Sequence, residues 1–135
     1  MDFRFATEVR VRFAETDAQG VAHNSVYLVW FEIARIDYLA RFRDGYPGLR
    51  AEGIEALTIE SHIRYRAPAR FDDRLTIHCA CGELRGARFR FDYEIEREGE
   101  PVGDGWTRHA CVDAVTHRPT RVPAWLAEAI ANSEA

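Results

Sequence analysis

One segment decides the fold: residues 26–42 read VYLVWFEIARIDYLARF. Its apolar residues fall on nearly every side of a helix. A surface helix normally buries a single apolar stripe, so a helix of this composition has to be enclosed by other elements. Asn24 or Ser25 can cap its start with a side-chain oxygen. The residues DGYPG at 44–48 end it, because glycine and proline interrupt helices.

The rest of the chain alternates apolar with charged residues, which is typical of strands with one buried face. The alternation covers residues 3–13, 57–66, 75–81, 89–96 and 106–114. Short turns join most of these segments, so neighbouring strands are expected to be antiparallel. Residues 123–131 predict a short terminal helix. In the first, third and last strands the pattern groups on one face Phe3, Phe5, Val9, Val11 and Phe13; Leu75, Ile77, Cys79 and Cys81; and Trp106, Arg108, Ala110, Val112 and Ala114.

The order of these elements predicts an α+β fold in one domain of 135 residues. A curved antiparallel sheet wrapped around the long helix is the simplest arrangement that hides the helix. Other α+β topologies share the same element order, so the pattern alone leaves them open.

Composition narrows the function classes. The net charge of −4 argues against a general nucleic-acid binder, although all 18 cationic residues are arginines, which suit anionic ligands. Residues 1–13 lack the apolar core of a signal peptide, and no apolar run reaches the roughly 20 residues that span a bilayer. Cys79 and Cys81 are expected in the core, without further ligands for a metal site. We therefore expect a cytoplasmic protein with no metal, no cofactor and no membrane insertion.

A carboxylate and a glycine lie in the loop before the helix, in residues 12–27 (RFAETDAQGVAHNSVY). Hydrolysis of a thioester needs a group that attacks the carbonyl or activates water, and donors for the oxyanion that develops. Asp17 is the candidate carboxylate, and the amides of Asn24 and Ser25 at the helix start are the candidate donors. The alternative is that Asp17 is a turn residue that bonds its own backbone.

The same segment resembles the signature of the 4-hydroxybenzoyl-CoA thioesterase family, which has the hot-dog fold. The resemblance covers most of the chain, including Arg85-Gly86 and residues 67–73 and 113–123. It implies a curved antiparallel sheet around a long central helix, and an acyl-CoA thioesterase that releases the free acid and CoA. In the signature segment the matching residues are Glu15, Thr16, Asp17, Gly20, Asn24, Tyr27, Trp30, Phe31, Glu32, Ala34 and Arg35.

The resemblance assigns roles to single residues. Asp17 takes the place of the catalytic aspartate, as nucleophile or as general base. The Asn24 amide takes the place of the group that polarises the carbonyl. Substrate binding is implied for Gly20, Tyr27, Trp30, Arg85 and Arg88, the arginines lying near the CoA nucleotide. Tyr27 and Trp30 can equally be core aromatics, and the arginines can be solvated strand-end charges.

The position of the histidine before the long helix differs from that in some relatives. The Tol-Pal-associated thioesterases carry histidine where this chain has Asn24, whereas here His23 stands one residue earlier. The His23-Asn24 pair is more similar to the Val-Asn-Asn variant of long-chain acyl-CoA thioesterases. His23 is therefore a candidate catalytic residue whose role the sequence leaves open. Glu32 is expected to pair with Arg35 one turn later. The other histidines are expected at the surface or in pocket walls: His62, His78, His109 and His117.

Two other functions fit the same residues. One is a non-catalytic acyl-CoA-binding sensor or regulator, and the other is a thioesterase that acts on acyl carrier protein. A small sheet around one helix leaves exposed strand edges. The family resemblance implies that two sheets join there in a homodimer, with active sites at the subunit boundary, and that dimers pair into a homotetramer.

Overall fold

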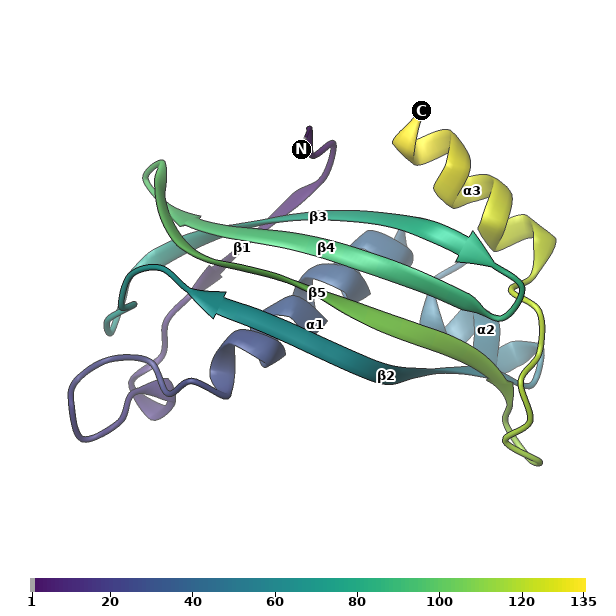
Figure 1. Cartoon of the computed structure of the whole chain (residues 1–135), viewed down its shortest axis with the longest axis horizontal. Coiled ribbons are helices and arrows are strands. Elements are labelled where there is room, and N and C mark those ends of the chain that lie inside the picture. The colour runs from purple at the N-terminus through teal and green to yellow at the C-terminus, as the bar shows by residue number, and fades with distance from the viewer. Residues whose placement is uncertain (1) are drawn as a thin grey trace.

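The long apolar segment forms α1 (Val26–Ala40), and one antiparallel sheet curves around it (Figure 1). This computed structural model describes residues 2–135. The sheet has the strand order β1-β3-β4-β5-β2. The α+β hot-dog architecture predicted from the sequence is confirmed. The strands are β1 (Ala6–Arg10), β2 (Ile54–Tyr65), β3 (Arg74–Arg85), β4 (Arg88–Arg97) and β5 (Glu100–Asp113), and the other helices are η1 (Phe13–Glu15), α2 (Tyr46–Ala51) and α3 (Ala124–Glu134).

The inner side of α1 packs directly on the sheet. Phe31 stacks on Tyr93 of β4 with a centroid separation of 4.1 Å. Gly105 of β5 allows this approach, because a Cβ atom there would lie 2.9 Å from the Phe31 ring. The outer side of the helix carries the exposed residues Leu28, Val29 and Ile36. The chain alone therefore encloses α1 only in part, although the helix is apolar on nearly every side.

Two expectations at the level of single residues are wrong, and one short helix was not expected. Phe13 is 75% exposed, because β1 ends at Arg10 and the chain turns into η1, where Phe13 packs edge-on against Phe71. Part of the segment expected to end α1 starts a new helix, α2, with proline in its first turn, where no backbone N–H is needed. His109 was expected at the surface or in a pocket wall and is 1% exposed.

The inward face of β5 explains the position of His109. Trp106 and Arg108 lie on the outer face, so Thr107 and His109, which alternate with them, point to the core. Inside, His109 Nε2 lies 2.7 Å from the Thr107 hydroxyl, which lies 2.6 Å from the Tyr93 hydroxyl. Burial, followed by the positive charge of Arg35, lowers the pKa of His109 to about 3.

Arg35 and Glu32 form the expected contact, but the two side chains are not equally buried. Arg35 Nη2 lies 3.6 Å from the Glu32 carboxylate, which is more than half exposed. Arg35 itself is 8% exposed and reaches the Thr58 hydroxyl at 3.5 Å. The pair is structural, and the arginine rather than the glutamate is its buried member.

The two edges of the sheet differ. At the β1 edge, α3 covers the part of β3 that β1 does not reach. There Glu134 accepts hydrogen bonds from the Cys81 N–H (3.0 Å) and from the Tyr38 hydroxyl. At the other edge, β2 pairs only with β5 within residues 2–135 and exposes Leu57 and Ile59, each 43% accessible. None of the helices in residues 2–135 is long and apolar enough to cross a membrane.

Candidate active site

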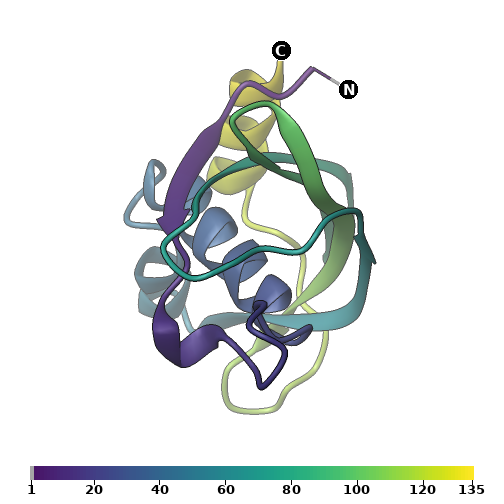
Figure 2. The same cartoon turned by 90° about the vertical axis from the view of Figure 1, so that its left-hand side faces the viewer.

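The loop before α1 is closed on itself by backbone hydrogen bonds. The Asp17 N–H donates to Val21 O (2.9 Å), and the Gly20 N–H donates to Asp17 O (3.0 Å). Gly20 has a φ of +80°, a conformation that side chains disfavour, so this turn requires glycine. Figure 2 shows the loop in front of the first turn of α1. Gly20 therefore shapes the loop that carries Asp17.

The Asp17 carboxylate has one oxygen committed to this turn. Its Oδ1 accepts a hydrogen bond from the Gln19 N–H (2.8 Å), as in an Asx-turn. Its Oδ2 has no hydrogen-bond partner among residues 2–135. Asp17 is thus a turn residue, as the alternative interpretation expected. Its second carboxylate oxygen can still act on a ligand.

At the start of α1 one of the two candidate donor amides has no acceptor. The His23 N–H donates to Glu15 O (2.8 Å), and the Val26 N–H donates to His23 O (3.0 Å). The Ser25 N–H donates to His23 Nδ1 (3.1 Å). The Asn24 N–H has no acceptor in the described chain. Of the two amides expected as donors, only that of Asn24 is uncommitted, and neither the Asn24 nor the Ser25 side chain caps the helix.

A cavity of about 320 Å³ opens beside this amide. Tyr27 and Tyr65 meet edge to face there, with centroids 4.8 Å apart. Burial raises the pKa of the Tyr27 hydroxyl, which keeps it protonated. Trp30 is 1% exposed and packs behind Tyr27, so it braces the first helical turn. The cavity is lined by Val21, Ala22, Asn24, Tyr27, Tyr65, Arg66, Ala67 and Pro68.

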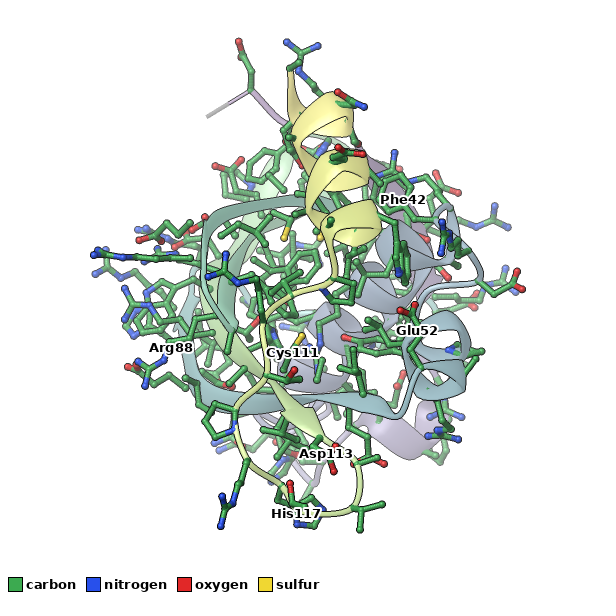
Figure 3. The ribbon with its side chains drawn as sticks, turned by 90° about the vertical axis from the view of Figure 1, so that its right-hand side faces the viewer. Phe42, Glu52, Arg88, Cys111, Asp113 and His117 are labelled. Carbon is green, nitrogen blue, oxygen red and sulfur yellow. The ribbon has the colours of Figure 1, made fainter. Side chains whose placement is uncertain are left out.

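Arg85 and Arg88 lie at the other end of the sheet. Arg88 is in register with Ala110, which is in register with Leu57 of β2. Tyr65, at the cavity, is eight residues further along β2, or about 26 Å at the usual rise per residue. Figure 3 shows Arg88 on the side of the molecule opposite to the one seen in Figure 2. One chain therefore does not bring these arginines to Asp17.

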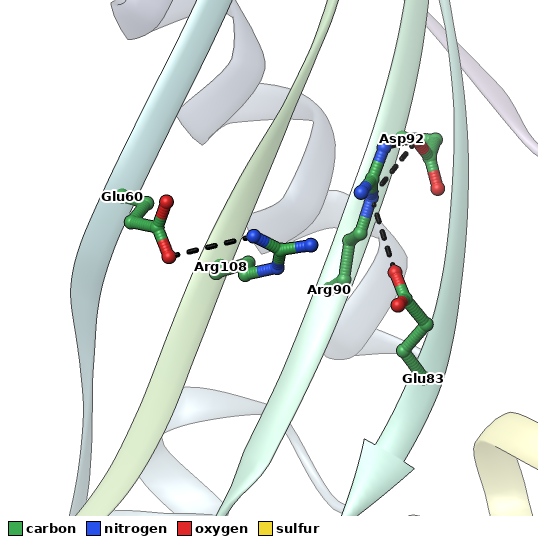
Figure 4. A network of polar contacts seen from close by, with 5 residues as sticks. All are labelled: Glu60, Glu83, Arg90, Asp92 and Arg108. Atoms are coloured by element: carbon green, nitrogen blue, oxygen red, sulfur yellow. Dashed lines mark hydrogen bonds and ion pairs between the residues drawn. The ribbon is translucent and has the colours of Figure 1, made fainter.

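The arginines border a groove of about 240 Å³ on the outer face of the sheet. Within it, Arg90 pairs with Glu83 (3.3 Å) and Asp92 (2.9 Å), and Arg108 pairs with Glu60 (3.4 Å), as Figure 4 shows. Arg85 and Arg88 form no ion pair with residues 2–135. The groove thus has two cations that no carboxylate neutralises, which suits a phosphate ligand.

A sequence profile of the thioesterase-like superfamily matches residues 11–130. The chain belongs to this superfamily. The match includes the Asp17 loop, α1 and all of β2 to β5. The resemblance inferred from the signature residues is therefore confirmed at the level of the family.

Relatives agree with this assignment. The chain is 30% identical over 120 residues to the acyl-CoA thioester hydrolase YbgC of Escherichia coli O6:H1, covering 88% of this chain and 90% of YbgC. It is 31% identical over 126 residues to a 1,4-dihydroxy-2-naphthoyl-CoA hydrolase of Synechococcus sp. CC9605, covering 86% and 85%. The crystal structure of protein TT1821 from Thermus thermophilus superposes with a TM-score of 0.88 at 37% identity, covering 94% and 97%.

Sequence reasoning missed two features of this site. Tyr65 was assigned to a strand by its alternation, and no sequence signal tied it to Asn24. The contact between His23 and Ser25 was also missed, although their spacing of two residues is one at which a side chain commonly reaches a backbone N–H.

Proposed function

We propose that the protein hydrolyses acyl-CoA thioesters to a free acid and CoA, with Asp17 as the essential carboxylate. The observation that carries the proposal is the uncommitted Asn24 N–H at the start of a 15-residue helix, beside an apolar cavity. The Thr16–Ala22 bridge closes the loop that holds Asp17, and Ala22 of this loop lines the same cavity. Relatives named as acyl-CoA hydrolases support the same chemistry.

In the proposed reaction the thioester carbonyl oxygen accepts a hydrogen bond from the Asn24 N–H. The positive end of the α1 dipole favours the negative charge that develops on this oxygen. Asp17 either attacks the carbonyl carbon, giving an anhydride that water opens, or takes a proton from the attacking water. In both routes the C–S bond breaks, and the sulfur leaves as a thiolate that takes up a proton from solvent.

The site is proposed to need a second copy of the chain. The apolar, unpartnered edge of β2 suits pairing with the same strand of another copy. Antiparallel pairing places the start of one β2 beside the end of the other. This brings Glu55 of one copy near Arg64 and Arg66 of its partner, so the charges are complementary. It also brings Arg85 and Arg88 of one copy to the end of the sheet that holds the partner's cavity.

Thiol release tests the proposed function. The purified protein is offered CoA esters of short, long and aromatic acids, and the same acids on acyl carrier protein. Release from CoA esters supports the proposal, and the preferred acid defines the acyl pocket. Tight binding without release would instead identify an acyl-CoA sensor. Release only from the carrier protein would identify the other thioesterase class.

A further inference from the structure

His23 Nδ1 receives two donors from one residue. The Ser25 N–H lies 3.1 Å from this nitrogen, and the Ser25 Oγ lies 2.8 Å from it. An amide N–H can only donate, so Nδ1 carries no proton. The Ser25 hydroxyl then also donates to Nδ1, and the proton of the neutral ring is on Nε2. The hydrogen bonds therefore favour the tautomer of His23 with the proton on Nε2.

The backbone groups around the Asn24 N–H are all held in place. On one side, His23 O accepts from the Val26 N–H (3.0 Å), and the His23 N–H donates to Glu15 O (2.8 Å). On the other side, Asn24 O accepts from the Tyr65 hydroxyl (2.9 Å). The remaining group is the Ser25 N–H, which donates to Nδ1 of the His23 ring. Removing the ring would leave the Ser25 N–H without this acceptor.

We propose that His23 is a positioning residue for the hydrolysis. Its Nδ1 atom holds the Ser25 amide and hydroxyl, which fixes the backbone next to the Asn24 N–H at the edge of the cavity. This inference rests on the proposed function and adds a residue to it. His23 does not transfer a proton in this role, so it can be replaced by another uncharged acceptor.

Two variants of His23 separate positioning from proton transfer. In His23→Asn the side-chain oxygen can accept the Ser25 N–H, as in an Asx-turn, and it does not ionise. His23→Ala offers no acceptor. We expect kcat to fall about ten-fold in the alanine variant, the scale of one lost hydrogen bond, with KM nearly unchanged. The asparagine variant should keep most of the wild-type kcat.

Either of two kinetic results overturns the inference. An asparagine variant as slow as the alanine variant means that His23 transfers a proton. An alanine variant at the wild-type rate means that the ring positions nothing. The unfolding midpoint of each variant in urea shows that the fold is retained.

A measurement without substrate keeps this inference separate from the proposed function. Nitrogen-15 NMR of the whole protein at about pH 8, above the usual histidine pKa of about 6.5, reports which ring nitrogen carries the proton. A proton on Nε2 of His23, in the wild type and in Ser25→Ala, supports the arrangement, because the Ser25 amide remains in that variant. A proton on Nδ1 overturns it. A wild type that binds but hydrolyses no thioester overturns the proposed function instead.

Discussion

The Tyr65 hydroxyl donates a hydrogen bond to the carbonyl oxygen of Asn24 over 2.9 Å. This bond ties the end of β2 to the first turn of α1, 41 residues earlier in the chain. The same two residues line the cavity that adjoins the uncommitted Asn24 N–H. The sheet edge that is proposed to join two subunits is thus bonded to the residue whose N–H is proposed to bind the oxyanion.

Tyr65→Phe removes this bond and keeps the ring that packs against Tyr27. We expect kcat for an acyl-CoA to fall between about three-fold and ten-fold, because a typical hydrogen bond is worth about 1 kcal/mol. KM should change little. Steady-state thiol release measures both constants. An unchanged kcat would show that β2 does not hold the Asn24 peptide in its working position.

Arg85→Ala combined with Arg88→Ala should raise KM about ten-fold or more for acyl-CoA, because two charge-assisted contacts to phosphate are lost. The increase should shrink at high salt, since exposed charges are screened. An acyl-pantetheine substrate, which lacks the nucleotide, should show no difference from the wild type. Arg4→Ala, also an exposed cation, is the control. Equal KM changes with and without the nucleotide would refute a phosphate role.

Ile59→Arg should convert the dimer to a monomer, because it places like charges on the β2 edges that meet. Light scattering at micromolar concentration measures the mass. Ile36→Arg is a matched control, since Ile36 is as exposed as Ile59 but lies on α1. The wild type is expected to be at least a dimer. A monomeric wild type would contradict the proposed joining of two sheets.

His109 makes stability depend on pH. Its pKa is about 3 in the folded chain and about 6.5 in the unfolded chain, so between these values the unfolded chain binds more protons. The free energy of unfolding should therefore decrease as the pH falls from about 6.5, by about 1.4 kcal/mol per pH unit from this residue. In His109→Gln this contribution is absent. Urea unfolding of both proteins at several pH values gives the two slopes, which should differ by this amount.

Most of the fold could be predicted because its two periodicities are strong. Nearly uniform apolarity in residues 26–42 indicated a helix that other elements cover, and alternation in the strands indicated the sheet that packs on its inner side. The errors occur where a residue's neighbours in space decide its place. Phe13 continues the alternation of β1, yet the chain leaves the strand before it. His109 lies in the core because the hydroxyls of Thr107 and Thr58 contact its two ring nitrogens, and Thr58 is 51 residues away in the sequence.

The candidate site could be predicted only in part. Asp17, Gly20 and Asn24 lie in one short segment, so local sequence identifies them. Whether a given amide is free depends on the side chain of His23 and on Tyr65, a residue of another element. The distance of Arg85 and Arg88 from Asp17 follows from the sheet register, which no local pattern reports. Their proposed contribution then requires the partner subunit.

The most direct measurement is thiol release from an acyl-CoA by Asp17→Asn. The amide oxygen of the new side chain can still accept the Gln19 N–H, so the loop should keep its shape. The variant lacks the negative charge needed to attack the carbonyl or to take a proton from water. We predict that kcat falls at least about 100-fold, with an unchanged urea unfolding curve. Wild-type turnover in the folded variant would contradict the role of Asp17.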